Sequence, residues 1–225
     1  MRVLAIDTST KFLCLGLADK TRFYEYRIEL GRRHLSLLVP TIKRILQALG
    51  CHAQDLDYFA VGLGPGSFTG LRVAVATIKG LGWAYKKPIV GISTLDIIAN
   101  NARKRDKPVV VAVDARRNLI YCSMYKSKAG ALKRISRDYL LRKEEFIKKV
   151  GGNALILGDA LDLHKGFFLE HLNGIEFLDK DYWYPEAHHM LNLALEKIKE
   201  RKVSSAFNTS PVYLYPKECQ IRGSN

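Results

Sequence analysis

Two periodicities alternate along the chain. Short apolar runs of about four to eight residues are typical of buried strands, and apolar positions that recur every three or four residues are typical of helices packed on a core. The first half of the chain predicts a strand hairpin at 3–17, further strands at 23–30, 58–63 and 88–92, and helices at 34–49, 69–86 and 94–104. Strands that alternate with helices in this way predict a mixed sheet covered by helices.

The second half repeats this pattern. A segment that starts at Val110, VVAVDARRNLIYCSM, aligns without gaps on a segment that starts at Val3, VLAIDTSTKFLCLGL. In both, an apolar run ends at an aspartate, a polar turn follows, and a second apolar run returns, so that Asp7 falls on Asp114. Further strands are predicted at 132–140, 154–157 and 175–178, with helices at 143–150, 160–172 and 186–201. A unit repeated in this order predicts a duplicated fold.

The repeated order of elements resembles the superfamily of actin, Hsp70 and sugar kinases. The resemblance implies an α/β protein with a duplicated actin-like or Hsp70-like (ASKHA) fold, in which two βββαβαβα lobes have mixed sheets and the second lobe is shortened. The charged run RKRDKP suits either a boundary or a solvated loop. Taken as the boundary, it gives an N-terminal lobe at 1–106 and a C-terminal lobe at 107–225, which ends in a non-helical tail.

Composition places the chain among ordinary globular proteins. Of its 225 residues, 48% are hydrophobic and 26% are charged, a balance that excludes a disordered chain. The four cysteines form no CxxC pair, and charges interrupt the longest apolar stretch. We therefore expect a cytoplasmic protein without disulfides, a signal peptide or a membrane span.

The formal net charge of +14 is spread over both halves of the chain. Such an excess attracts nucleic acid over long distances. The same excess is also typical of a solubility feature or a lysine-rich thermophile surface, and the sequence carries no RNA-binding module. The charge therefore leaves a contact with tRNA open without locating it.

A glycine-rich loop, GLGPGSFTG, joins the predicted strand 58–63 to the predicted helix 69–86. Gly64, Gly66 and Gly70 permit close backbone approach, while Ser67 and Thr69 are suited to cap a helix N-terminus, where anions bind. The loop has neither the Gly-Lys-Ser/Thr of a Walker A sequence nor the spacing of GxSxG. Two interpretations remain, a structural turn and a phosphate or nucleotide contact.

The helix predicted after this loop is apolar on nearly all sides, with Arg72 and Lys79 on one narrow stripe. A helix of this kind is buried on more than one side. It is either a central core helix or a helix that packs on its own sheet and, beside helix 34–49, on a partner subunit. In the second case we expect the interface to contain Leu35, Leu38, Ile42, Ile45, Leu71, Arg72, Val75, Ile78 and Lys79.

Asp7 and Asp114 stand where the actin-like superfamily places its metal and phosphate machinery. Their turns, DTSTKF and DARRNL, contain no glycine, although a turn that grips phosphate needs exposed backbone N–H groups. We therefore expect impaired nucleotide binding; two aspartates that cap hairpin turns are an equal alternative. The candidate anion or nucleotide contacts are Asp7, Gly64, Gly66, Ser67, Thr69, Gly70, Asp114 and Arg116.

Metal and catalytic chemistry find little support in the sequence. The six histidines form neither an HxxxH nor an HExxH pair, and no nucleophile–base pair is recognisable. The adjacent His188 and His189 lie near the start of a predicted helix, as surface or capping residues do. We therefore predict no metal site and no catalytic residue.

Five segments occur in a characteristic order: VLAIDTST, GRRHLSLLVPTIKRIL, DLDYFAVGLGPGSFTGLRVAVATIKGL, PIVGISTLDIIA and VAVDARRNLIY. Together they resemble the TsaB (YeaZ) family, most specifically through GPGSFTGLR followed by VGISTL. The resemblance is strong over 1–125 and weaker over 126–201. It resumes at 211–216, PVYLYP, which resembles the closing motif of the family.

The resemblance implies a non-catalytic subunit of the machinery that installs threonylcarbamoyladenosine at position 37 of ANN-decoding tRNAs. TsaB binds and activates its catalytic paralogue TsaD, or pairs with itself, through helices of the N-terminal half, and helps to recruit TsaE. The resemblance implies no tightly bound cofactor. It leaves ATP or ADP open as a ligand at the interface of the complex. TsaD carries a metal-binding HxxxH pair where this chain has Thr94 and Ile98, neither of which can replace imidazole.

Two other classes of function stay open at this point. An actin-like ATPase or small-molecule kinase would use Asp7 and Asp114 in an interdomain cleft, with the loop Gly64–Gly70 on a phosphate. A metallopeptidase would need a metal, for which the sequence offers no motif.

Overall fold

The computed structural model describes residues 1–20, 22–29, 34–103, 105–128 and 131–215, without the side chains of His34, Leu35 and Lys128. The chain forms two compact units. Unit 1 comprises Met1–Asn101 and Tyr184–Pro211, and unit 2 comprises Ala102–Trp183 and Val212–Asn225. The division differs from the predicted lobes 1–106 and 107–225, because the chain returns to unit 1 at Tyr184.

Unit 1 is built on a five-stranded mixed sheet in the order β3-β2-β1-β4-β5. Its antiparallel part is β1 (Arg2–Asp7), β2 (Phe12–Asp19) and β3 (Arg22–Glu29), and the strands β4 (Tyr58–Gly62) and β5 (Ile89–Ile92) continue it in parallel. β1 is buried on both faces from Val3 to Asp7, which agrees with its uninterrupted apolar run. The mixed sheet predicted for the first half is confirmed.

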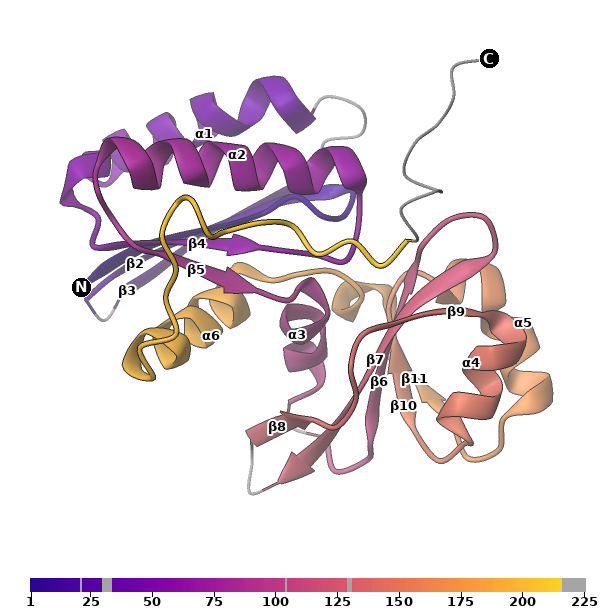
Figure 1. Cartoon of the computed structure of the whole chain (residues 1–225). Coiled ribbons are helices and arrows are strands. Elements are labelled where there is room, and N and C mark those ends of the chain that lie inside the picture. The colour runs from indigo at the N-terminus through magenta and orange to yellow at the C-terminus, as the bar shows by residue number, and fades with distance from the viewer. Residues whose placement is uncertain (21, 30–33, 104, 129–130, 216–225) are drawn as a thin grey trace, which may run out of the picture. The chain divides into compact units, whose positions relative to one another are not determined.

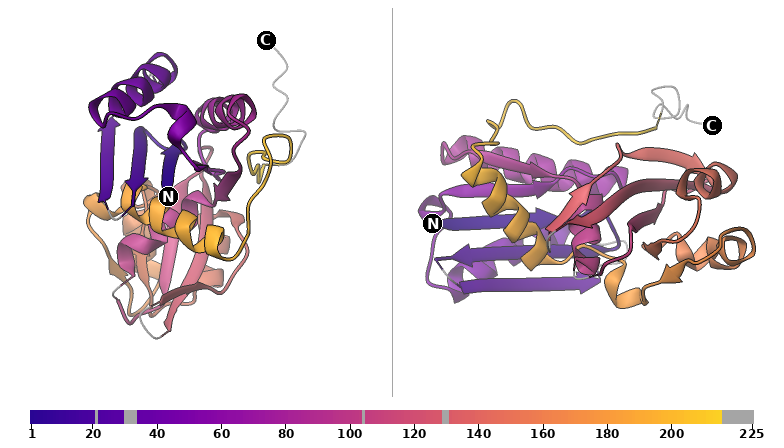
Figure 2. Two further views of the ribbon diagram at one scale, coloured as in Figure 1. Left: turned by 90° about the vertical axis from the view of Figure 1, so that its left-hand side faces the viewer. Right: turned by 90° about the horizontal axis from the view of Figure 1, so that it is seen from below.

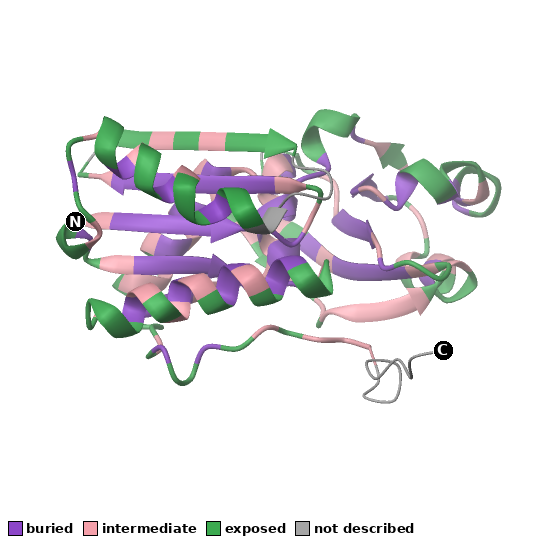
Figure 3. Ribbon diagram, turned by 90° about the horizontal axis from the view of Figure 1, so that it is seen from above, coloured by how far each residue is buried: buried purple, intermediate pink, exposed green. Residues whose placement is uncertain are grey.

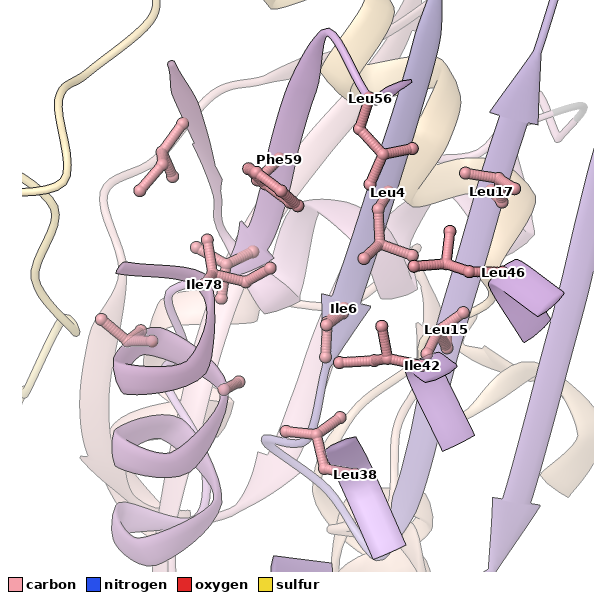
Figure 4. Close-up of a cluster of buried hydrophobic side chains, with 14 of the residues drawn as sticks. Leu4, Ile6, Leu15, Leu17, Leu38, Ile42, Leu46, Leu56, Phe59 and Ile78 are labelled. Carbon is pink, nitrogen blue, oxygen red and sulfur yellow. The ribbon is translucent and has the colours of Figure 1, made fainter. Parts of the chain in front are cut away.

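Helices cover both faces of this sheet (Figures 1 and 2). The helices α1 (His34–Ala48) and α2 (Phe68–Ala84) lie side by side on one face, and α6 (Ala187–Lys199) lies on the other. Figure 4 shows Leu38, Ile42 and Ile78 pointing from α1 and α2 toward the sheet. The short helices η1 (Ala53–Asp55), α3 (Thr94–Ala99) and η2 (Asn100–Ala102) complete the connections.

The position of α6 corrects the sequence-based assignment of this helix to the second lobe. Met190, Leu191 and Ala194 are buried in a core cluster with residues of β1, such as Val3 and Ala5. A Cβ on Gly16 would lie 2.9 Å from Leu191 Cδ1, so the strand glycine permits the helix to approach closely. The apolar stripe of α6 therefore completes the core of unit 1.

Unit 2 repeats the strand order of unit 1. Its sheet runs β11-β10-β6-β7-β8, in which β6 (Val109–Asp114) and β7 (Leu119–Lys128) correspond to β1 and β2. β10 (Leu155–Leu157) and β11 (Glu176–Phe177) are parallel to β6, as β4 and β5 are to β1. The duplication predicted from the aligned hairpins is therefore confirmed by topology.

The third strand of unit 2 departs from the prediction of one strand at 132–140. It is divided into β8 (Ala131–Arg134) and β9 (Tyr139–Arg142), which pair with different parts of β7. An ion pair between Arg134 and Asp138 lies at the break. The helices α4 (Lys143–Val150) and α5 (Leu161–His171) pack together, with the rings of Phe146 and Phe168 stacked at 4.6 Å, and η3 (Lys180–Tyr182) follows. None of the helices in the described ranges has an apolar stretch long enough to cross a bilayer.

Candidate functional site

Asp7 ends β1 in unit 1, and the turn that follows begins with the buried residues Thr8 and Ser9. Its Oδ1 accepts hydrogen bonds from the amide and the hydroxyl of Ser9, at 2.8 and 2.6 Å, and its Oδ2 accepts one from the hydroxyl of Thr94, at 2.9 Å. Burial raises the pKa of the Asp7 carboxyl, and the bonds from Ser9 and Thr94 oppose that shift. Both carboxylate oxygens are thus engaged inside the protein.

The glycine-rich loop packs directly on this turn. A Cβ on Gly70 would lie 1.9 Å from the carbonyl oxygen of Thr8, and a Cβ on Gly66 would lie 2.5 Å from that of Ser9. The hydroxyl of Thr8 donates to the carbonyl of Gly70 at 2.7 Å, and the amide of Ser67 donates to the carbonyl of Ser9 at 2.7 Å. The glycines therefore serve close backbone packing, which favours the interpretation of the loop as a structural turn.

The remaining predicted contacts of the loop lie around the start of α2 and α3. Ser67 is the N-cap of α2 and accepts from the amide of Gly70 at 3.3 Å, while the neighbouring Thr69 is exposed. The carbonyl of Gly64 accepts from the amide of Thr94 at 2.9 Å. Thr94 takes the place that the family resemblance assigns to a metal-binding histidine, and here it joins α3 to the Asp7 turn.

Asp114, the counterpart of Asp7 in unit 2, lies in a more open turn. Its Oδ1 accepts from the amide of Arg116 at 2.8 Å, and the Arg116 guanidinium, whose side chain is 88% exposed, lies 3.3 Å from Oδ2. The residues Arg116, Arg117 and Asn118 have φ angles of 67°, 53° and 57°. The hydroxyl of Tyr215 donates to the carbonyls of Ala115 and Arg116, at 2.7 and 3.3 Å. The closing motif of the sequence thus holds this left-handed turn.

Sequence reasoning missed Asp159, which supports the Asp114 turn. Its Oδ1 accepts from the amide of Asp114 at 2.8 Å, and burial raises the pKa of its carboxyl to about 6. The preceding Gly158 has a φ of 123° and approaches the carbonyl of Ala112, where a Cβ would lie at 2.1 Å. By strand register Gly158 lies opposite Ala112, the counterpart of Ala5, so its counterpart in unit 1 is Ala60, and the repeat gave no signal for Asp159.

The predicted interface residues on α1 and α2 require a correction. The side chains of Leu38, Ile42, Leu71, Val75 and Ile78 belong to the core of unit 1. Figure 4 shows Leu38, Ile42 and Ile78 pointing toward the sheet. All five side chains are buried, so they are unavailable to a partner. Ile45 and Lys79 are half-buried, and Lys79 donates to the carbonyl of Thr209 at 3.0 Å. The side chain of Leu35 lies outside the described residues.

The outward sides of these two helices carry a different set of apolar side chains. On α1, Leu37 and Val39 are 40% and 59% exposed, and on α2, Phe68 is 39% exposed. Among the predicted interface residues with described side chains, Arg72 is the exposed one, and its guanidinium lies 3.8 Å from the centre of the Phe68 ring. Figure 3 shows exposed residues along the outer side of the helix layer. Whether a partner binds there stays a prediction.

Among the described residues, one group has the chemistry of metal ligands: Glu186, His188 and His189. The Nδ1 of His188 lies 3.2 Å from a carboxylate oxygen of Glu25 and 3.5 Å from one of Glu186. Because Glu25 belongs to β3 and His188 to α6, these contacts tie the helix to the edge of the sheet. The geometry explains the cluster as a structural contact between polar groups.

Comparisons with known proteins agree with this architecture. The profile of a family described as "TsaD: tRNA N6-adenosine threonylcarbamoyltransferase" matches residues 29–163. A Bacillus subtilis "tRNA threonylcarbamoyladenosine biosynthesis protein TsaB" is 34% identical over 169 residues, which cover 73% of this chain and 74% of the relative. The Escherichia coli protein of the same description is 27% identical over 95% of this chain and 94% of its own. The solved structure "YeaZ from Pseudomonas aeruginosa" superposes with a TM-score of 0.82 at 26% identity, over 94% of this chain and all of that one.

The repeated sheets, each with an aspartate at the end of its first strand, define the class as duplicated actin-like α/β proteins. Within this class the matches extend over most of the chain. The chain belongs to the TsaB (YeaZ) family.

Proposed function

We propose that this chain is a non-catalytic subunit in the synthesis of threonylcarbamoyladenosine at position 37 of ANN-decoding tRNAs. Its relatives from B. subtilis and E. coli are described as proteins of this biosynthesis. In the proposal, the chain binds and activates a TsaD-type catalytic protein, helps to recruit a TsaE-type ATPase, and meets tRNA within the complex. Without a TsaD-type partner, the chain forms a homodimer through the surface that otherwise binds that partner. The proposed place for ATP or ADP is the interface between the subunits of the complex.

The closed state of the Asp7 turn is the observation that carries the proposal. A carboxylate that serves metal or phosphate chemistry needs an oxygen open to the ligand, whereas Asp7 is 0% exposed and engages Ser9 and Thr94 with both oxygens. The same observation argues against the actin-like ATPase or kinase, which would bring ATP and a metal to Asp7. The closed Asp7 turn therefore supports a protein interaction surface as the function of the chain.

The outward side of α1 and α2 supports this role. Leu37, Val39 and Phe68 are large apolar side chains exposed on two adjacent helices, and Arg72 stacks on the Phe68 ring. Exposed apolar side chains on adjacent helices, and an arginine stacked on an aromatic ring, are typical of protein interfaces. We name these four residues the helix-layer surface.

The double variant L37E/V39E tests the assignment of the helix-layer surface. Two carboxylates buried against an apolar partner surface would be costly, so we expect affinity for the TsaD-type protein to fall at least about tenfold. Circular dichroism and thermal unfolding should stay unchanged, because both positions are exposed. The matched control is F23E/I28E, which places the same charges on exposed positions of β3. Equal affinities of wild type and L37E/V39E in titration calorimetry would rule out this surface.

A further inference from the structure

A hollow with a cavity volume of about 510 Å³ lies in unit 1, at the opposite end of α2 from the glycine-rich loop. Its walls are the last turn of α2, the residues that lead into β5, and the segment 203–207. The segment is fixed to the sheet by two hydrogen bonds, from the amide of Ile89 to the carbonyl of Ser204 at 2.8 Å and from the amide of Ser204 to the carbonyl of Ile89 at 2.7 Å. These two hydrogen bonds hold the segment 203–207 against β5, so this wall of the hollow is fixed by the backbone.

Two aromatic side chains at this hollow face solvent. Trp83 is 68% exposed and Phe207 is 79% exposed, and both line the same cavity from different parts of the chain. Large aromatic rings are seldom left in water around one cavity without a ligand, because their burial is worth more free energy than that of most side chains. A flat ligand that stacks on these rings is the occupant they suit.

Charge defines the ligand further. Lys86 and Lys87 line the hollow together with the hydroxyl-bearing Ser204 and Ser205, and none of the described residues that line it is acidic. Lysines interleaved with solvent-facing aromatic rings match the phosphates and bases of single-stranded nucleic acid. Protein interfaces are also rich in aromatic residues but depleted of lysine, so the two lysines favour nucleic acid as the occupant. The net charge of +14 acts in the same direction at longer range.

We propose that this hollow binds single-stranded RNA, with a base stacked on Trp83 or Phe207 and the adjoining phosphates at Lys86 and Lys87. The proposal adds a direct RNA contact to the protein contact proposed above, and it rests on that proposed function only for the choice of a tRNA anticodon stem-loop as one probe. The other probe is a ten-nucleotide oligoribonucleotide without secondary structure. Both are titrated with the full chain, without any partner protein.

The indole of Trp83 provides a direct signal of stacking. The only other tryptophan, Trp183, is 6% exposed and donates its Nε1 hydrogen to the carbonyl of Leu178, so quenching by RNA reports on Trp83. We expect both probes to quench wild-type fluorescence. In W83F a stacking ring remains, so RNA binding measured by anisotropy should stay within about threefold while the quenching disappears. W83A/F207A removes both rings and should bind at least about tenfold more weakly.

The electrostatic arm uses K86E/K87E with K43E/R44E as its control, since Lys43 and Arg44 are exposed on α1. K86E/K87E should weaken binding and reduce the slope of affinity against salt by about two, and the control should change both much less. Equal losses in the two variants, or wild-type affinity in W83A/F207A, would overturn the site. The absence of RNA binding by the wild-type chain would also overturn the site. If W83A/F207A then lost affinity for the TsaD-type protein, the hollow would belong to the protein interface instead. The helix-layer variants report on the proposed function separately, so either proposal can fail alone.

Discussion

Asp7 shows how one buried residue can change the meaning of a motif. In the sequence, an aspartate that ends a strand and starts a polar turn suits both a phosphate site and a turn cap. The structure gives each carboxylate oxygen a donor from the protein, and Gly62 lies so close that a Cβ would be 1.9 Å from Oδ2. At this residue, a structural role accounts for every contact seen.

Substitution of Asp7 tests that role. D7A leaves the amide of Ser9 buried without its acceptor, so we expect the free energy of unfolding to fall by about 2–4 kcal/mol. D7N keeps an acceptor for Ser9 and removes the buried charge, so its loss should be clearly smaller. Urea unfolding at neutral pH measures both. Equal losses in the two variants would contradict a role based on hydrogen-bond acceptance.

Asp159 predicts a dependence of stability on pH. Its folded pKa of about 6 lies above its ordinary value of 3.8, so between these values the folded chain binds a proton that the unfolded chain does not. Stability from this group therefore falls as pH rises through the window, and at neutral pH the ionised carboxylate costs roughly 2–3 kcal/mol. D159N should be more stable than wild type at pH 7.5, and the difference should shrink toward pH 4. A difference independent of pH would show that Asp159 does not titrate in this way.

Within α2, two glycines have opposite roles. Gly70 is in the first turn, against the carbonyl of Thr8, whereas a Cβ on Gly80 would meet nothing within 4 Å. G70A should therefore destabilise the fold by at least about 2 kcal/mol, because two backbone segments must separate. G80A should stabilise it by about 0.5–1 kcal/mol through helix propensity. Thermal unfolding of the pair provides the comparison, and similar effects of both changes would refute the packing argument.

The elements themselves followed well from the sequence. β1, α2 and α4 lie close to their predicted ranges, because each has a continuous apolar run or a clear helical period. Which side of a helix faces the core was harder to predict on α1 and α2. Val75 on α2 and Leu38 on the neighbouring α1 belong to the interface only in the interpretation that α2 packs on a partner. The structure places both in the core, and no local pattern distinguishes a sheet from a partner as the cover of an apolar helix. The break between β8 and β9 depends on pairing with β7, which is a non-local property.

At the scale of the molecule, the internal repeat predicted two sheets of one topology, and the structure has them. The repeat could not predict that α6 returns to unit 1, because its stripe of Met190, Leu191 and Ala194 would suit the core of either lobe. The position of the tail was equally hard to predict. Tyr215 donates to the backbone carbonyls of Ala115 and Arg116 in the Asp114 turn, and a contact with backbone atoms leaves no signal in the sequence. Long-range contacts of this kind decide where the ends of the chain belong.

The central claim is that the chain acts by binding a catalytic partner and performs no chemistry itself. The most direct measurement is the formation of threonylcarbamoyladenosine on an ANN-decoding tRNA in a reaction reconstituted from a TsaD-type protein, a TsaE-type protein and the activated threonylcarbamoyl donor. The account predicts no product from this chain alone and a loss of product when it is omitted from the full mixture. Product formed by this chain alone, or undiminished product without it, would contradict the account.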